Sequence, residues 1–261
     1  MPGRALPNDW IVILKPTKSP RARLLCFPQG GGGATGFNEW PGHLPEDIEV
    51  CAVQLPGRGR RMFEDPPTSI DQVLVALRER FQPFRETPVA FFGHSLGAWV
   101  AFEFARQLQR EGVTVAHLFV SGQCAPHLPD PEAPIRTWPD REFIAEVHRR
   151  YRGFPEEILR DDETLALLLP ALRADFTMKE TYRYLDGPLL ECPISSFGGH
   201  QDGSVSVEEL EAWGDRTCGT FGFGMFPGDH SFIDSARESV LQSVALDLER
   251  SLLESSLKGP R

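Results

Sequence analysis

The pentapeptide GHSLG at residues 93–97 constrains the fold of this 261-residue chain more than any other feature. It follows the apolar run PVAFF and precedes AWVAFEFARQLQREG, which has helical spacing. A strand that turns sharply into a helix at a serine needs small flanking residues, because a Cβ there would clash in the strained turn. We therefore predict that Ser95 is a nucleophile presented at a strand-to-helix turn. An ordinary turn with a surface serine is the alternative.

Short runs of β-branched and aromatic residues, bounded by proline and glycine, alternate with amphipathic helical stretches. This alternation predicts an α/β protein with a mostly parallel sheet and helices on both faces. Apolar residues at spacings of three or four predict helices over residues 70–84 and 232–252. Ser206 and Glu209 predict a capping box at the start of another helix. We predict strands at residues 10–14, 22–27, 48–54, 88–93, 115–121, 193–198 and 219–226.

The segment between residues 126 and 192 interrupts the strand pattern. It opens with the proline-rich HLPDPEAPIRTWPD and then becomes helical. We predict a helical lid at residues 127–188, inserted into a core made of residues 1–126 and 189–261. Such a lid can leave an acyl-sized groove beneath it, and a helical decoration without substrate contact is the alternative. The lid helices carry apolar stripes at Phe143, Ile144, Val147 and Tyr151 and at Leu165, Leu168, Leu169, Leu172 and Phe176.

The charge and the cysteines of the chain bear on its partners and location. A net charge of −10 and a pI near 5.2 exclude nucleic acid as a main partner, because phosphate binding needs a surplus of Lys and Arg on one face. Of five cysteines, Cys26, Cys51 and Cys192 fall inside apolar runs, which indicates a reduced, cytoplasmic protein. The apolar stretch at residues 10–14 is too short to span a membrane. We expect no membrane association and a monomer.

A serine nucleophile needs a base, and a carboxylate should hold the tautomer of that base. In this kind of site the acid and then the histidine follow the serine along the chain. Of seven histidines, His230 follows the last predicted strand in the loop PGDHSF, and we predict that it is the base of Ser95. Asp202 follows the preceding strand in FGGHQDGSV and is our predicted acid, with Asp229 as the alternative. The turn, the sheet and this order together predict the α/β-hydrolase fold.

Attack on an acyl group creates an oxyanion, which preorganised backbone N–H groups stabilise. We predict that Leu96, the residue after the serine, donates one N–H group. The second should come from the loop FPQGGGGATGF after an earlier strand. Gln29 is our candidate and Gly30 is the alternative.

The same loop formally matches a dinucleotide-binding pattern, G-x-G-x-x-G, at Gly31, Gly33 and Gly36. Pro41 and Pro45 oppose a long helix after it, and the next strand ends without the acidic residue that binds ribose. We therefore favour the oxyanion loop and predict neither a cofactor nor a metal site.

Arg58, Arg60 and Arg61 form a positive cluster in LPGRGRRMF, on the loop after a predicted strand. A solvated loop is the default interpretation. The alternative is contact with the phosphate of a pantetheine arm or with an acidic carrier protein, since the arginine fork suits phosphate.

The chain resembles the type II thioesterases that accompany modular polyketide and nonribosomal peptide synthetases. The resemblance covers nearly the whole chain and rests on FPQGGGG, QLPGRGRR, GHSLGA, LPALRADFTMKETYRY, GGHQDGSV and FPGDHSF. It implies that Ser95, Asp202 and His230 form a catalytic triad, and that the lid shapes an acyl pocket entered by a phosphopantetheine arm. It further implies hydrolysis of misprimed or stalled acyl groups from acyl or peptidyl carrier proteins.

Two positions depart from the pattern of that family. His200 and Gln201 stand where the acid loop tends to be more acidic, and Gln29-Gly30 replaces a more usual aromatic residue or histidine followed by alanine. The second departure leaves open which N–H group completes the oxyanion hole. A carboxylesterase or lipase, an acyltransferase and a non-enzymatic binding protein are the alternative functions on this fold.

Overall fold

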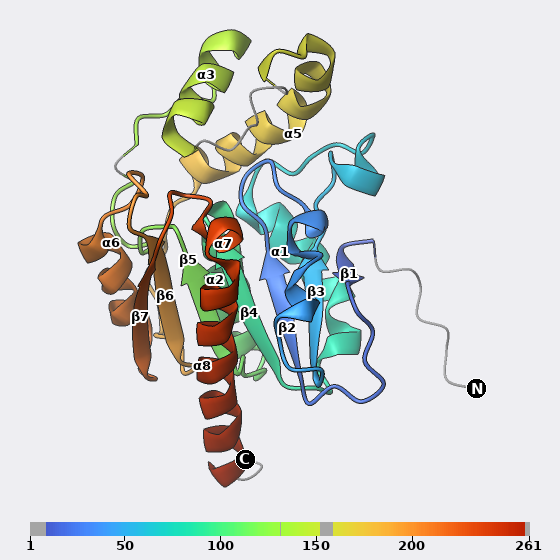
Figure 1. The fold of residues 1–261 in the computed structure, drawn as a ribbon, viewed down its shortest axis with the longest axis vertical. Helices are drawn as coiled ribbons and strands as arrows, with labels where there is room; N and C mark the ends of the chain where they lie inside the picture. Colours follow the sequence, from blue (N-terminus) through green and yellow to red (C-terminus); the bar gives the residue numbers. More distant parts are fainter. Residues whose placement is uncertain (1–8, 131, 152–158, 259–261) are drawn as a thin grey trace.

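The computed structural model describes residues 9–130, 132–151 and 159–258, and its centre is one seven-stranded sheet (Figure 1). The strand order is β1-β3-β2-β4-β5-β6-β7; β1 runs antiparallel to β3, and all other neighbours are parallel. Both ends of every strand lie within two residues of the predicted ends. The strands are β1 (Ile11–Ile13), β2 (Ala22–Phe27), β3 (Ile48–Val53), β4 (Val89–His94), β5 (His117–Ser121), β6 (Ile194–Gly199) and β7 (Phe221–Phe226).

Helices cover both faces of this sheet, as the alternation of patterns predicted. α1 and α2 pack on one face, while α8 packs on the other together with the short turns η1 and η2 (Figure 1). Every residue of β4 is buried, because a central parallel strand has both faces covered. The core elements are η1 (Ala34–Phe37), η2 (Trp40–Gly42), η3 (Gly59–Arg61), α1 (Ile70–Arg80), η4 (Gln82–Phe84), α2 (Leu96–Arg110), α6 (Val207–Glu211), η5 (Ala212–Arg216), α7 (Phe232–Ser235) and α8 (Arg237–Lys258).

Two helices differ from their predicted extent, and a third begins as predicted. The helix predicted over residues 70–84 ends at Arg80, because Pro83 lacks an N–H group and disfavours helical backbone before it. The helix predicted over residues 232–252 is broken at Ala236, whose φ of −113° is not helical. The apolar residues keep their four-residue spacing across this break, so periodicity could not reveal it. The predicted capping box is present at the start of α6.

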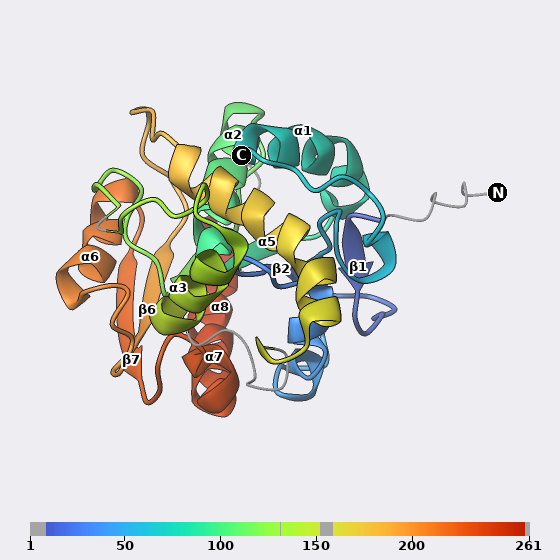
Figure 2. The ribbon, with the colours of Figure 1, turned by 90° about the horizontal axis from the view of Figure 1, so that it is seen from above.

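α3 (Asp140–Tyr151) and α5 (Asp162–Thr181) lie between β5 and β6 in the sequence and stand above the carboxyl ends of the strands (Figures 1 and 2). All residues of the two predicted apolar stripes except Leu168 belong to a small core between these helices or pack against it. Residues 131 and 152–158 of the predicted lid lie outside the described residues. The lid boundaries at residues 127 and 188 stay a prediction. The buried residues of this small core are Ile135, Phe143, Ile144, Val147, Leu172 and Phe176.

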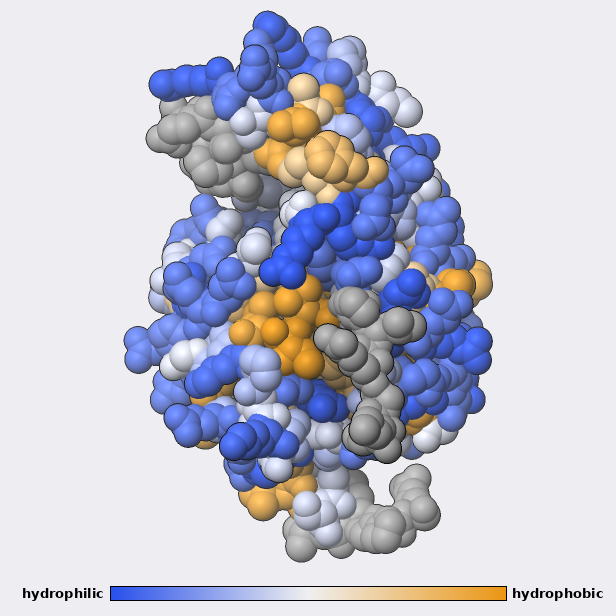
Figure 3. All heavy atoms as spheres, turned by 90° about the vertical axis from the view of Figure 1, so that its right-hand side faces the viewer, coloured by the Kyte–Doolittle hydropathy of each residue, from blue (hydrophilic) through white to orange (hydrophobic). Residues whose placement is uncertain are grey.

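The antiparallel strand β1 forms one edge of the sheet. Figure 3 faces this edge and shows apolar atoms gathered near its centre, and Ile13 of β1 is 39% exposed. With three residues, the strand is short, which limits pairing with other chains. Among the described residues, no helix is both long and apolar enough to cross a membrane.

His117 of β5 is a buried polar residue that the sequence did not single out. Its ring stacks on Phe119 at 4.1 Å between centroids, and its two nitrogens lie 2.8 Å from the Ser251 hydroxyl and 2.9 Å from the Ser195 hydroxyl. Burial lowers the pKa of His117 to about 3, and burial likewise lowers the pKa of His94 to about 3. Both imidazoles are therefore neutral in the folded protein at ordinary pH.

These two histidines should make the protein less stable in mild acid. In the unfolded chain a histidine binds its proton near pH 6.5, whereas the folded protein resists protonation down to about pH 3, so stability falls as the pH drops through this window. We expect a loss of about 1–2 kcal/mol per histidine between pH 7 and pH 5, measured by urea unfolding. His117→Gln should make this loss smaller than in the wild type, while the exposed His43→Gln should not. An equally steep loss in His117→Gln would contradict this assignment.

Candidate active site

Ser95 stands at the strained turn between β4 and α2. Its φ of 53° and ψ of −126° make it the one residue other than glycine with a positive φ among those the structure describes. A Cβ on Gly93 would lie 2.3 Å from the carbonyl oxygen of Gly97, and a Cβ on Gly97 would lie 2.2 Å from the carbonyl oxygen of Phe27. Glycine at position 93 therefore allows β4 to turn sharply into α2, and glycine at position 97 allows α2 to start so close to the end of β2.

Asp202 and His230 meet at the same end of the sheet, in the loops after β6 and β7. Nδ1 of His230 lies 2.8 Å from Oδ2 of Asp202, and the side chains of both residues are buried. The other carboxylate oxygen, Oδ1, accepts hydrogen bonds from the backbone N–H and the hydroxyl of Ser204, at 2.9 and 2.6 Å. With Nδ1 held by the carboxylate, Nε2 is the ring nitrogen left for Ser95, which lines the same cavity.

The hydrogen bonds around Asp202 determine its charge. Burial by itself would raise the pKa of this carboxyl, but the hydrogen bond and the charge of His230 and the two bonds from Ser204 outweigh it. The pKa of Asp202 is therefore below its ordinary value, and the carboxylate is ionised at neutral pH.

Neither the alternative acid, Asp229, nor the second histidine of these loops, His200, has a hydrogen bond with the His230 imidazole among the described residues. The Asp229 carboxylate instead accepts the N–H of Ser231 at 3.0 Å and so closes the turn before α7. His200 is exposed.

Two aromatic rings flank His230 and were missing from the sequence-based site. The rings of His94 and Tyr151 both lie 4.9 Å from its centroid. Nδ1 of His94 is 2.9 Å from the Ser121 hydroxyl, and burial keeps this imidazole neutral, so it places no second positive charge beside His230. Only long-range pairing through the sheet brings Ser121 to His94, which is why no local sequence pattern could reveal this support.

Both predicted oxyanion donors line the same cavity as Ser95. Leu96 is the first residue of α2, where N–H groups have no partner within the helix. Gln29 and Gly30 follow β2, and no hydrogen bond among the described residues uses the N–H of either. The choice between Gln29 and Gly30 therefore stays open.

The cavity lies between the lid and the carboxyl end of the sheet. One wall is apolar, formed by Val147, Leu172 and Phe176 of the lid helices and by Ile233 of α7. Ser95 and His230 lie on the wall that the core contributes. A cavity with an apolar wall opposite a nucleophile is typical of a site for an acyl group.

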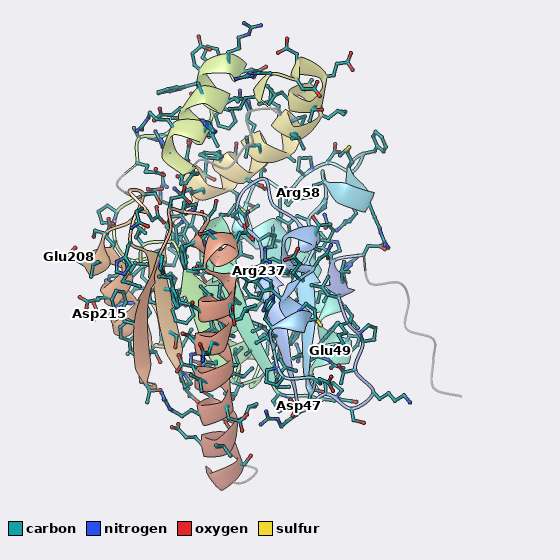
Figure 4. All side chains as sticks on the ribbon, in the orientation of Figure 1. Asp47, Glu49, Arg58, Glu208, Asp215 and Arg237 are labelled. Atoms are coloured by element: carbon teal, nitrogen blue, oxygen red, sulfur yellow. The ribbon has the colours of Figure 1, made fainter. Side chains whose placement is uncertain are left out.

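The arginine cluster is not the solvated loop that the sequence suggested. The Arg58 side chain lies beneath the lid helix α5 (Figure 4) and is buried. It forms two hydrogen bonds with Asp175, at 2.6 and 2.8 Å. Arg61 is also buried; it pairs with Glu64 and lies over the ring of Trp10 at 4.6 Å. The guanidinium groups of Arg58 and Arg61 are therefore not free to bind a phosphate. Of the three arginines, only Arg60 is exposed.

The fold and the arrangement of these side chains define a class of protein. A mostly parallel sheet, a serine at a strained strand-to-helix turn and a His–Asp pair in later loops are the features of an α/β-hydrolase.

Comparison with known proteins narrows this class. The family model "Thioesterase domain" matches residues 22–248. The gramicidin S biosynthesis protein GrsT of Aneurinibacillus migulanus is 41% identical over 242 residues, which cover 92% of this chain and 94% of that protein. The chain belongs to the thioesterase family, as the resemblance predicted, and is a thioester hydrolase.

Two solved structures are similar over nearly their whole length. The type II thioesterase BorB from the borrelidin biosynthetic cluster has a TM-score of 0.84 and 36% identity, covering 92% of this chain and 97% of that one. YbtT, a type II thioesterase from the yersiniabactin NRPS/PKS biosynthetic pathway, has a TM-score of 0.84 and 29% identity, covering 93% and 99%.

The turn at Ser95 should tolerate no side chain at Gly97. Because a Cβ there would meet the backbone of β2 and not a flexible side chain, we expect Gly97→Ala to lower the free energy of unfolding by at least about 2 kcal/mol. Gly36→Ala is the matched control, since nothing lies within 4 Å of its added Cβ. Denaturant unfolding of both variants checks this, and equal stability of the two would contradict the close packing of the turn.

Proposed function

We propose that this thioesterase hydrolyses acyl groups from the phosphopantetheine arm of carrier proteins, using Ser95, His230 and Asp202 as its triad. The observation that carries the proposal is that His230, hydrogen-bonded to Asp202, lines the same cavity as Ser95, and that this cavity has an apolar wall. The relatives support the choice of substrate, because BorB and YbtT are type II thioesterases of biosynthetic pathways and GrsT is a gramicidin S biosynthesis protein.

In the proposed acylation step, Nε2 of His230 takes the hydroxyl proton of Ser95 as the serine oxygen attacks the thioester carbon. The N–H groups of Leu96 and Gln29 stabilise the negative charge on the carbonyl oxygen. The C–S bond then breaks, the pantetheine sulfur leaves with the proton from His230, and the acyl group stays on Ser95. A thiol with a pKa near 8.5 needs less help from this proton than an alcohol would.

In the deacylation step, His230 removes a proton from water as the water oxygen attacks the acyl-serine ester. The ester bond breaks, His230 returns the proton to the Ser95 oxygen, and the free acid leaves. Asp202 stays ionised throughout and stabilises the imidazolium that forms in each step.

The biological role that fits this chemistry is editing, in which misprimed or stalled acyl groups are removed from the carrier proteins of a polyketide or nonribosomal peptide synthetase. This role rests on the kind of relatives that the chain has. Two finer expectations stay predictions: a monomer, and a cytoplasmic location. The second rests on the cysteines, of which Cys26, Cys51, Cys124 and Cys192 are buried.

Ser95→Ala should abolish hydrolysis of acyl carrier proteins and leave the fold intact, because one hydroxyl contributes little to the free energy of unfolding. The measurement is release of free acid and of the carrier thiol from an acyl carrier protein, with circular dichroism as the control for folding. Matched oxoesters should be hydrolysed more slowly than thioesters by the wild type. Full activity of the folded Ser95→Ala variant would end the proposal.

Asp202→Asn should lower kcat by roughly 10³–10⁴-fold, because an amide cannot hold the imidazole tautomer or stabilise the imidazolium. Asp229→Asn is the matched control, since Asp229 lies next to His230 in sequence but binds the N–H of Ser231. We expect its kcat to stay within about threefold of the wild type. Steady-state kinetics on one acyl carrier protein compares the variants, and the opposite ranking would make Asp229 the acid.

A further inference from the structure

The loop that carries the second oxyanion donor is held by the lid. Residues Gln29 to Gly32 form a tight turn, closed by a 2.9 Å hydrogen bond from the N–H of Gly32 to the carbonyl oxygen of Gln29. Gly31, the third residue of the turn, has a φ of +75°, which is the type II geometry that glycine allows. In this geometry the N–H of Gly31 points out of the turn, and it donates a 2.6 Å hydrogen bond to Oδ2 of Asp175 in α5.

Arg58 completes the attachment from the other side. Its guanidinium donates to both oxygens of Asp175 and also to the carbonyl oxygen of Gly32, at 3.1 Å. The carboxylate therefore holds the peptide between Gly30 and Gly31, inside the turn, and the guanidinium holds the peptide that directly follows the turn. Both side chains are almost fully buried, with exposed fractions of 1% for Asp175 and 6% for Arg58. A charge buried in this way needs its partner, because removal of either one leaves the other uncompensated.

The C-terminal end of the oxyanion loop is held by the segment after β3 that carries Arg58. The Gln54 side chain accepts the N–H of Ala34 at 3.0 Å and donates to the carbonyl oxygen of Arg58 at 3.1 Å. The oxyanion loop is thus attached at its start to the lid and at its end to the segment after β3. The peptide between Gly30 and Gly31 is the one that could rotate, since the type I and type II turns differ by a flip of this peptide.

We propose that Asp175 and Arg58 are positioning residues for the oxyanion hole. Their ion pair holds the turn of residues 29–32 against α5 and so keeps the N–H of Gln29 or Gly30 in place for the substrate oxygen. This inference rests on the proposed function, since the turn matters only if it supplies an oxyanion donor. A consequence is that α5 of the lid must be docked on the core for the oxyanion hole to be complete.

The variant that tests this is Asp175→Asn. An asparagine keeps only one acceptor oxygen, and its NH₂ group must face a donor of Arg58 or of Gly31, so the two hydrogen bonds from Arg58 cannot both survive. We expect kcat on an acyl carrier protein to fall by about 10–100-fold with KM within about threefold, because an oxyanion donor acts mainly in the transition state.

Glu180→Gln is the matched control on the same helix. The Glu180 carboxylate also accepts backbone N–H groups, those of Ile135 and Arg136, and it also pairs with an arginine, Arg136. These three residues are absent from the described lining of the cavity. We expect kcat of this variant to stay within about threefold of the wild type, although it loses a comparable buried charge.

A second readout separates positioning from a purely structural role. A trifluoromethyl ketone analogue of acyl-pantetheine forms an oxyanion on the serine, whereas the corresponding amide binds without one. We expect Asp175→Asn to weaken the ketone by the same 10–100-fold factor as kcat and to leave the binding of the amide unchanged within about threefold. If Asp175→Asn does not fold, Arg58→Lys replaces it, because lysine keeps the charge but loses the two-pronged contact. Arg58→Lys should likewise weaken binding of the ketone and leave binding of the amide unchanged.

The proposal is overturned if the folded variant loses no more kcat than Glu180→Gln, or if both analogues weaken equally. These results are distinct from a failure of the proposed function, which would appear as an inactive wild type on acyl carrier proteins. Wild-type activity is measured first in the same assay.

Discussion

The close approach of α2 to the end of β2 is the constraint on which the site depends. Because Gly97 has no side chain, the start of α2 packs on the carbonyl group of Phe27. This contact fixes Ser95 in a backbone conformation that costs about 1–3 kcal/mol in a residue other than glycine. It also brings the loop that begins two residues after Phe27 alongside Ser95 and Leu96. One backbone contact therefore positions both the nucleophile and the oxyanion loop.

The parallel sheet supplies the rest of the site. Parallel strands end at the same edge, so the loops after β6 and β7 reach the turn after β4 although they follow it by more than a hundred residues. The hydrogen bonds from Ser204 and His230 keep Asp202 ionised, and burial keeps His94 neutral. The imidazole of His230 therefore lies between one uncharged ring and one fixed negative charge, and that charge stabilises the imidazolium that forms when Ser95 gives up its proton.

A feature of this structure could be predicted from the sequence only where its pattern lies within a short stretch of residues. The strands, the turn at Ser95 and the loops of Asp202 and His230 carry their patterns within about ten residues, and the structure has them where the patterns indicated. The pairing of Arg58 with Asp175 spans 117 positions and leaves no local mark. Arg58 therefore resembled a solvated cation in the sequence, although it is buried beneath the lid. The break at Ala236 was missed because the apolar spacing continues through it.

The most direct test of catalysis through an acyl-Ser95 intermediate is an intact-protein mass spectrum taken shortly after mixing with an acyl-pantetheine, followed by peptide mapping. We expect a mass increase equal to the acyl group less one hydrogen, located on the peptide that contains Ser95 and lost as free acid appears. This mechanism is contradicted if the acyl group is found on another residue, or if hydrolysis proceeds in a single turnover without any acylated protein.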